Sequence, residues 1–346
     1  MTYSLTESFP EPRFDWRKLL AFCTEAFRAA GCSDEHAKTV ADNLMQAELR
    51  GVRSHGLLHV KEYIEKLQSG AINKAPRLRV LNETSGALLV DGDHAPGSVS
   101  GTFAMDMCVG KAAVTGTASA AVRNGTHFGM AAYYAMRALP RDMIGFAFCS
   151  AQPRVAVYGG IDGVMGTNPI CAAVPAGSEF PIVYDGATSA ITYNRTFLAA
   201  REGRVIERGL LLDKDGNDTD DPGALFDGGV FLPFGGYKGS GLAVLVNVLC
   251  TLLTGISEDL TNVGFYFAAV DVRVFQEPGL FKRSVDAMVR RMKASRKRGG
   301  CEHIYMPGEI EFLNHAEQSK NGVALSESVL SDLVELGLRM EDGVII

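Results

Sequence analysis

Apolar residues recur with helical spacing at both ends of the chain, whereas the centre alternates short apolar stretches with glycine-rich turns. One apolar stripe near the N-terminus consists of Trp16, Leu19, Leu20, Cys23 and Phe27. Further helices are predicted to about Arg50, from Leu57 to Gln68, and finally to Met340. Between residues 144 and 185 the pattern changes to short strands separated by glycine loops. This order of periodicities predicts an α/β fold.

The same pattern predicts three parts. Residues 1–75 form an N-terminal helical part, residues 76–275 a mixed α/β region, and residues 276–346 a C-terminal helical part. We expect the two terminal parts to pack together as one helical domain. The most apolar stretch, Leu242–Leu253, is predicted to be a buried helix, because it is shorter than the ~18 residues that a membrane-spanning segment needs.

Composition excludes several classes of function. The chain has 346 residues and a formal net charge of −6, which argues against nucleic acid as a partner. The first ten residues are polar and carry no secretory signal, and no apolar run predicts a membrane span. The seven cysteines are odd in number and include no C-x-x-C pair. These features predict a cytoplasmic protein with free thiols.

A search for nucleotide-binding motifs gives a mixed result. No G-x-G-x-x-G follows a predicted strand, so a Rossmann site is not supported. The segment around Gly236, Tyr237 and Lys238 instead places four glycines and one lysine at the start of a helix. This arrangement favours a phosphate or carboxylate site, and the alternative is a glycine-rich entry that serves helix packing.

The turn after the second predicted helix contains Ser54, His55 and Gly56. A histidine held between a hydroxyl and a glycine at a helix junction can present a free imidazole to a cleft. Imidazole both gives and takes a proton near neutral pH. His55 is therefore a candidate acid/base, and a loop histidine that only satisfies backbone groups is the alternative.

Three more loops at predicted strand ends carry polar side chains. His127 lies between a strand and a helix, Thr167 and Asn168 separate two strands, and Asp185 ends a strand. Loops at strand ends often gather functional groups. His127 is a candidate hydrogen-bond donor to a substrate oxygen, and Asp185 is a candidate to orient a histidine. Each loop has an ordinary turn or helix cap as its alternative reading.

A metal site is the rival interpretation. His55 and His59 have the i, i+4 spacing of a zinc-binding pair, but Gly56 replaces the glutamate of the H-E-x-x-H motif. We therefore predict no metal, and a metal-dependent hydrolase using these two histidines stays the less favoured alternative.

Six short motifs occur in one order between residues 54 and 309. They are SHG at 54–56, NGTHFG at 124–129, GTNP at 166–169, DGATS at 185–189, GGYKGSGLA at 235–243 and MPGE at 306–309. Together they resemble the malate/L-lactate dehydrogenase family, also called the sulfolactate dehydrogenase-like family. That family includes ureidoglycolate dehydrogenase, diketogulonate reductase and piperideine-2-carboxylate reductase.

The resemblance implies a fold and an activity. The fold is a non-Rossmann, mixed-sheet NAD(P)-binding domain with a helical domain built from both chain ends, so the cofactor and substrate fall in residues 76–275. The activity is reduction of a 2-oxo or 2-imino acid, or a related ketone, with NAD or NADP as cofactor. The protein is expected to be a homodimer that acts on a small molecule and binds neither nucleic acid nor membrane.

Residue roles follow from the same resemblance. His55 is the proton donor, with Ser54, Asp185 and His127 as the other catalytic residues. Predicted cofactor contacts are Ser150, Asp185, Gly186, Ala187, Thr188, Ser189, Gly236, Tyr237, Lys238, Pro307, Gly308 and Glu309. Predicted substrate contacts are Arg53, His59, Tyr63, Thr167 and Asn168.

The chain departs from the family pattern at several positions. Where relatives have an arginine for the substrate carboxylate, this chain has His59, and an imidazole cannot form the two parallel hydrogen bonds of a guanidinium. Either Arg53 takes over that role or the substrate lacks a carboxylate there. Gly186 replaces a methionine and Tyr237 a histidine, and the segment AITYNRTFLAA differs from the small-residue run of relatives. These departures keep a second hypothesis open, a non-catalytic ligand-binding relative.

Overall fold

The computed structural model describes residues 12–255, 263–341, 344 and 345, so the polar N-terminal segment on which the absence of a signal was predicted lies outside the described residues. The α-helices are α1 (Trp16–Ala29), α2 (Asp34–Leu49), α3 (Val60–Ser69), α4 (Gly97–Thr115), α5 (Ala131–Ala135), α6 (Tyr193–Arg201), α7 (Tyr237–Asn247), α8 (Pro278–Lys293), α9 (Glu309–Asn321) and α10 (Glu327–Glu335). Short 3-10 or π turns are η1 (Arg53–His55), η2 (Leu57–His59), η3 (Met136–Arg141), η4 (Pro222–Asp227), η5 (Val248–Leu252) and η6 (Val272–Val274).

The strands of the described residues form four sheets. The large sheet contains β2 (Arg79–Glu83), β3 (Ala87–Asp91), β4 (Thr117–Gly125), β5 (Met143–Cys149), β8 (Ile170–Val174), β9 (Ile182–Gly186) and β13 (Val263–Asp271). The small sheet contains β6 (Val155–Ala156), β7 (Gly163–Met165), β10 (Leu211–Leu212), β11 (Asp218–Thr219) and β12 (Val230–Phe231). Two further pairs are β1 (Arg13–Phe14) with β14 (Val323–Ala324), and β15 (Met340–Glu341) with β16 (Val344–Ile345).

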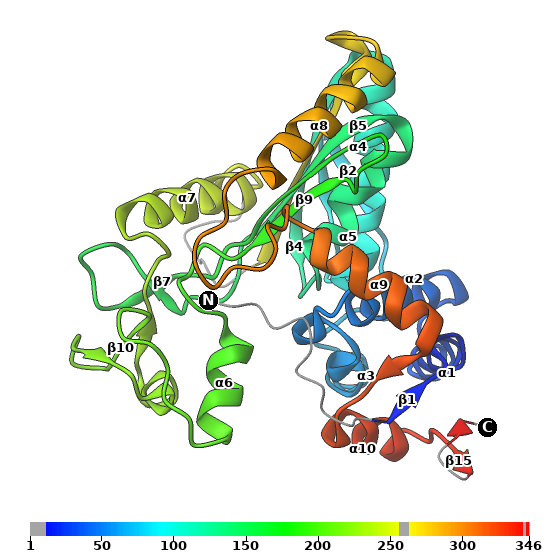
Figure 1. The fold of residues 1–346 in the computed structure, drawn as a ribbon. Helices are drawn as coiled ribbons and strands as arrows, with labels where there is room; N and C mark the ends of the chain where they lie inside the picture. Colours follow the sequence, from blue (N-terminus) through cyan, green and yellow to red (C-terminus); the bar gives the residue numbers. More distant parts are fainter. Residues whose placement is uncertain (1–11, 256–262, 342–343, 346) are drawn as a thin grey trace.

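Helices from both chain ends gather beside one end of the large sheet (Figure 1). Asp15 caps α1 by accepting a hydrogen bond from the backbone of Arg17, and Ser33 caps α2 in the same way. Apolar side chains of α1 to α3 share one core with Val323, Leu333 and others near the C-terminus, and β1 pairs with β14. The two ends thus form one packed unit.

The large sheet has the order β2-β3-β4-β13-β5-β8-β9. Only β3 and β4 pair in parallel, and α4 connects them; the other neighbours in this sheet are antiparallel. Apolar side chains from α4, α5 and the sheet form the largest core. The fold is therefore mixed α/β, as the sequence predicts. A smaller lobe with α6 and the five-stranded sheet has its own core (Figure 1).

The prediction that Leu242–Leu253 is buried is wrong for the isolated chain. This segment spans α7 and η5, and it leaves Leu245, Leu252 and Leu253 more than half exposed. Only one side of the helix packs, through residues such as Ala243 and Val246. Apolar composition alone does not reveal whether such a face packs within the chain or on its surface. In the part of the chain that the structure describes, no helix is long and apolar enough to cross a membrane.

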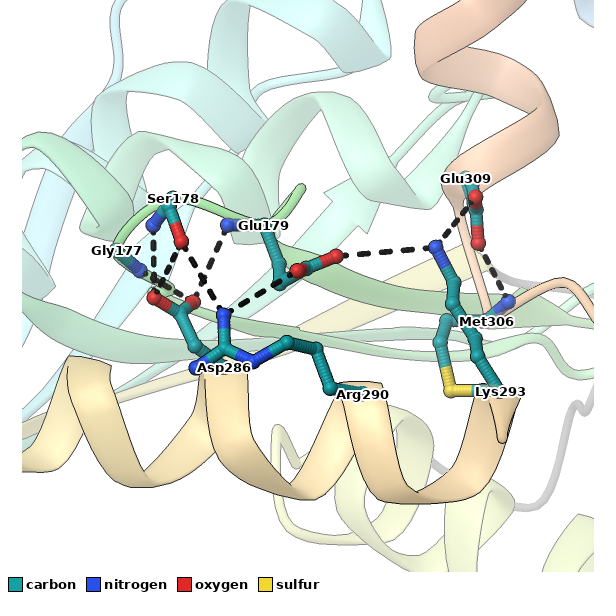
Figure 2. A network of polar contacts seen from close by, with 8 residues as sticks. All are labelled: Gly177, Ser178, Glu179, Asp286, Arg290, Lys293, Met306 and Glu309. Carbon is teal, nitrogen blue, oxygen red and sulfur yellow. Dashed lines mark hydrogen bonds and ion pairs between the residues drawn. The ribbon is translucent and has the colours of Figure 1, made fainter. Parts of the chain in front are cut away.

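A buried carboxylate fastens α8 to the loop before β9 (Figure 2). Asp286 accepts hydrogen bonds from the backbone N–H groups of Gly177, Ser178 and Glu179, at 2.8–3.2 Å, and from the Ser178 hydroxyl at 2.9 Å. Burial by itself raises the pKa of Asp286, but these hydrogen bonds outweigh it and lower the pKa to about 2. The basic helix α8 is thus anchored by an anion.

Replacing Asp286 with asparagine is expected to lower the free energy of unfolding by about 2–3 kcal/mol at pH 7, because the amide keeps only one acceptor oxygen and turns an NH2 donor toward the other N–H groups. The folded-state pKa lies below that of an unfolded aspartate, so the stabilisation is present above pH ~4 and is lost as the pH falls toward 2. Urea unfolding at several pH values measures this. Asp227, which forms an exposed ion pair with Lys214, provides the control. Asp227→Asn should lower the free energy of unfolding by less than ~1 kcal/mol.

Candidate active site

The turn that carries His55 is fixed by close packing on α2. The helix ends before Gly51, which has a φ of +76° that side chains rarely adopt. The carboxylate of Glu48 then accepts a hydrogen bond from the backbone of Leu57 at 2.9 Å. A Cβ on Gly56 would lie 2.0 Å from an oxygen of that buried carboxylate. A side chain at position 56 would therefore displace the Glu48 carboxylate that fixes this turn.

Three histidines and one tyrosine from separate segments form a cluster. The rings of His55 and His127 are stacked, with centroids 5.7 Å apart. The ring of His59 lies 6.4 Å from that of His55 and 4.9 Å from that of His127. The ring of Tyr63 stacks on His59 at 5.5 Å. The structure thus unites four of the residues that the sequence singles out.

Each of the two stacked histidines uses its Nδ1 for a protein contact. Ser54 Oγ lies 2.9 Å from Nδ1 of His55, and the hydroxyl of Tyr63 forms a short hydrogen bond with Nδ1 of His127. Within the described chain, Nε2 of His55 and Nε2 of His127 have no protein partner. Both Nε2 atoms are therefore available to a substrate.

The surroundings favour the neutral form of the two stacked histidines. Burial first, and then the nearby His59, lower the pKa of His55 to about 4. The same two causes, in the same order, lower the pKa of His127 well below its ordinary value, and burial raises that of Tyr63. Yet solvent still reaches His55 in part and His127 freely. Groups that protein surrounds but solvent touches are suited to proton transfer with a small molecule.

Asp185 was expected to form a hydrogen bond with a histidine, but its hydrogen-bond partner is a backbone N–H group. Its carboxylate accepts a hydrogen bond from the backbone N–H of Ala132, at 2.7 Å, because β9 ends beside the first turn of α5. No hydrogen bond joins it to a histidine in the described residues. Burial raises the pKa of Asp185 to about 6, against the lowering effects of this hydrogen bond and of the buried Arg50. Asp185 remains a candidate site residue, because its side chain is exposed to solvent.

The GTNP loop is part of the framework. Asn168 is fully buried, and its amide donates to the carbonyl of Ala243 and the side chain of Asn247 while accepting from Ala151 N–H. A left-handed φ of +37° places the amide in this position. Asn168 therefore connects three segments of the chain, and none of these contacts involves the histidine cluster.

The other predicted loop residues also make structural contacts. The Ser150 hydroxyl accepts from Gly264 N–H at 2.9 Å and so joins β5 to β13. Thr188 is buried, and its hydroxyl donates to the carbonyl of Thr167 at 3.1 Å. Ser189 is buried as well, whereas Gly186 and Ala187 are half-buried. Contacts between these residues and a cofactor stay predictions.

The GGYKG segment forms the open start of α7. Gly235 and Gly236 both have positive φ, and no side chain caps the helix. The buried Ser240 accepts a hydrogen bond from Tyr158 N–H, which holds Tyr158 over this turn. A largely apolar recess of about 390 Å³ lies beside the turn and is lined by Tyr158, Ala190, Gly209, Leu210, Leu232, Pro233, Phe234, Gly235 and Gly236. Tyr237 and Lys238 are exposed nearby.

The MPGE segment docks α9 on β9. The carbonyl of Pro307 accepts from Val183 N–H at 2.9 Å, and a Cβ on Gly308 would lie 2.7 Å from Val183 Cβ. Figure 2 shows Glu309 between Met306 N–H and the ammonium group of Lys293, at 2.9 and 2.6 Å. This glutamate, a predicted cofactor contact, thus already has two protein partners.

Two residues of the site, Asn194 and Glu62, were not identified from the sequence. A third residue, Arg53, was predicted to contact the substrate but contacts a backbone carbonyl outside the cluster. Asn194 of α6 donates to the carbonyl of Ser54 at 2.7 Å, across 140 residues of sequence. Glu62 contacts His59 at 2.7 Å, and its i+3 spacing on α3 was the available signal. Arg53 instead extends to the carbonyl of Ala324, at 3.0 Å.

The fold brings three histidine rings and a tyrosine together where solvent reaches them, and enzymes often use such titratable groups for proton transfer. In the described residues, no group of three or more His, Cys, Asp and Glu side chains is arranged to hold a metal ion.

Comparison with known proteins gives a consistent result. Residues 14–334 match the family described as malate/L-lactate dehydrogenase. The malate dehydrogenase of Pyrococcus horikoshii is 35% identical over 339 residues, which cover 93% of this chain and 94% of that protein. The L-sulfolactate dehydrogenase of Methanocaldococcus jannaschii is 34% identical over 334 residues, which cover 92% and 96%. The structure of malate dehydrogenase from Entamoeba histolytica superimposes with a TM-score of 0.90 at 29% identity, covering 94% of this chain and 97% of that one.

The chain belongs to the malate/L-lactate dehydrogenase family. The resemblance that the six motifs indicated is therefore confirmed, and so is the prediction of a dehydrogenase.

Proposed function

We propose that this enzyme interconverts a 2-oxo or 2-imino acid, or a related ketone, with its reduced form, and that His55 is the proton donor. The observation that carries the proposal is the histidine cluster, in which Nε2 of both His55 and His127 has no protein partner within the described chain. Relatives named for malate and sulfolactate support an acid as the substrate.

The cofactor proposed is NAD or NADP. The start of α7 fits such a group, because two glycines with positive φ leave its backbone N–H groups uncapped beside Lys238, and the recess of about 390 Å³ adjoins them. Gly236 and Lys238 would hold its phosphates. When bound, a nicotinamide cofactor supplies or accepts the hydride. The mostly antiparallel large sheet supports a binding mode outside the Rossmann pattern.

The chain's own residues handle the proton. As the substrate carbonyl becomes an alcohol, negative charge develops on its oxygen, and His55 delivers a proton to that oxygen from Nε2. Ser54 holds the ring through Nδ1, and Tyr63 holds His127 in the same way. His127 can donate a second hydrogen bond to the oxygen. In the reverse direction the neutral His55 accepts the alcohol proton.

Absorbance at 340 nm tests the function. NADH and NADPH are each offered with pyruvate, oxaloacetate, sulfopyruvate, cyclic 2-imino acids and carboxylate-free ketones. Cofactor oxidation with one of these substrates supports the proposal. No turnover across the panel, with cofactor binding retained by isothermal titration calorimetry, would favour the alternative of a ligand-binding relative.

We also propose a cytoplasmic homodimer. The exposed apolar side chains of α7 and η5 include Val244, Leu245, Val248, Leu252 and Leu253, and such a contiguous face is typical of a subunit interface. Light scattering after size exclusion should give twice the mass of one chain, and Leu245→Glu with Leu252→Glu should yield monomers. A monomeric wild-type protein would contradict the proposal. The cysteines in the described residues are all free, which supports a reducing compartment.

A further inference from the structure

Both ring nitrogens of His59 face atoms that can only accept hydrogen bonds. Nδ1 lies 2.7 Å from a carboxylate oxygen of Glu62, and Nε2 lies 3.0 Å from the carbonyl oxygen of Ser54. A neutral imidazole carries only one N–H, so one of its nitrogens would direct a lone pair at an oxygen lone pair. Only the doubly protonated ring satisfies both contacts.

We propose that Glu62 is a positioning residue that keeps His59 doubly protonated, so that His59 is a fixed positive charge beside His55 and His127 and selects an anionic substrate. With both N–H groups engaged, His59 has no donor left for the substrate and acts through its charge. The catalytic consequence rests on the proposed function, whereas the protonation state of His59 does not.

The charges around His59 are consistent with this role. Glu62 also pairs with Lys66 at 2.6 Å, so His59, Glu62 and Lys66 together carry one net positive charge. The hydrogen bond from His59 lowers the pKa of Glu62 to about 2, which keeps the carboxylate ionised. The positive charge lies beside two rings whose neutral form is favoured, and it therefore attracts a carboxylate or an oxygen that gains negative charge.

Charged groups on the neighbouring elements have partners of their own. On α2, Glu48 accepts from the backbone of Leu57. On α3, Lys61 forms ion pairs with Asp332 and Glu335 of α10, at 3.1 and 2.6 Å. Arg53 of η1 lies 3.9 Å from Glu48 and donates to a backbone carbonyl. Within the described residues, the hydrogen bonds of His59 itself are with Glu62 and Ser54.

His59 also fixes the residue that holds His55. Its Nε2–H and the amide of Asn194 both donate to the carbonyl of Ser54, whose hydroxyl contacts His55. The charge of His59 can be removed without removing its hydrogen bond to the carbonyl of Ser54, because glutamine at position 59 is uncharged and can still donate to that carbonyl.

The first test is independent of turnover. Nitrogen-15 NMR of histidine-labelled protein at pH 7, with His59→Gln for assignment, reports whether one or both ring nitrogens carry hydrogen. We expect His59 to be doubly protonated in the wild type and in Glu65→Gln, an exposed position on the same helix, and singly protonated in Glu62→Gln. A singly protonated His59 in the wild type would overturn the inference even if the enzyme turns over its substrate.

The second test compares an oxo acid that is turned over with its methyl ester, which differs only in charge. Glu62→Gln and His59→Gln should each lower the preference for the acid, as the ratio of kcat/KM values, by about 10-fold, while Glu65→Gln leaves it unchanged. The loss should fall on KM for the acid. An unchanged preference in both variants would overturn the role in selectivity. Failure of every substrate would refute the proposed function, and the NMR result would still decide the protonation state.

Discussion

Replacing His55 with alanine is expected to lower the turnover number roughly 10²–10⁴-fold while the affinity for the cofactor stays nearly unchanged. The imidazole is the group whose free Nε2 lies in the cluster, and alanine removes it without touching the glycine-rich turn of α7. Steady-state kinetics and calorimetric titration of the cofactor measure the two quantities separately. Full turnover in this variant would rule out His55 as the proton donor.

The pH dependence of the same reaction has a defined sign. In the proposed mechanism, oxidation needs the neutral His55 and reduction needs the protonated form, and the pKa of this group is lowered to about 4 by burial and by His59. Accordingly, kcat/KM for oxidation should fall as the pH drops through about 4, and kcat/KM for reduction should fall as the pH rises above that value. His303→Ala, at an exposed histidine, is the control and should retain the wild-type profile.

Replacing Gly97 with alanine is expected to lower stability by about 1–3 kcal/mol and turnover by about 100-fold. A Cβ at this position, the first residue of α4, would lie 2.5 Å from the carbonyl oxygen of His127, 2.6 Å from that of Thr126 and 2.7 Å from the Cα of Phe128. All three atoms belong to the backbone, so the loop itself must shift. That shift moves His127 away from His55 and Tyr63.

The same helix offers a matched control. Gly110 is exposed, and a Cβ there would meet nothing within 4 Å. Gly110→Ala should therefore raise helix stability by about 0.5–1 kcal/mol and leave turnover unchanged. Thermal unfolding and steady-state kinetics of both variants make the comparison. Wild-type stability and turnover in Gly97→Ala would show that the loop does not depend on this close packing.

Local sequence was enough to predict the helices near both ends, because a helix depends on periodicity and capping within a few residues. Asp15 and Ser33 cap α1 and α2, and the turn after Leu49 brings Ser54 and His55 to a helix junction. The ordered motifs were also enough to indicate the family. Apolar composition, in contrast, misled for α7 and η5, where hydrophobicity did not distinguish an exposed face from a core.

Sequence patterns alone were sufficient to indicate the kind of fold, the family and the candidate polar loop residues. The tertiary structure decided which of them meet: Tyr63 and His127 form their hydrogen bond across 64 residues, Asn194 reaches Ser54 across 140, and Asp185 contacts Ala132 and no histidine in the described chain. Side-chain partners at such separations depend on how strands and helices pack, and no short-range pattern encodes that packing.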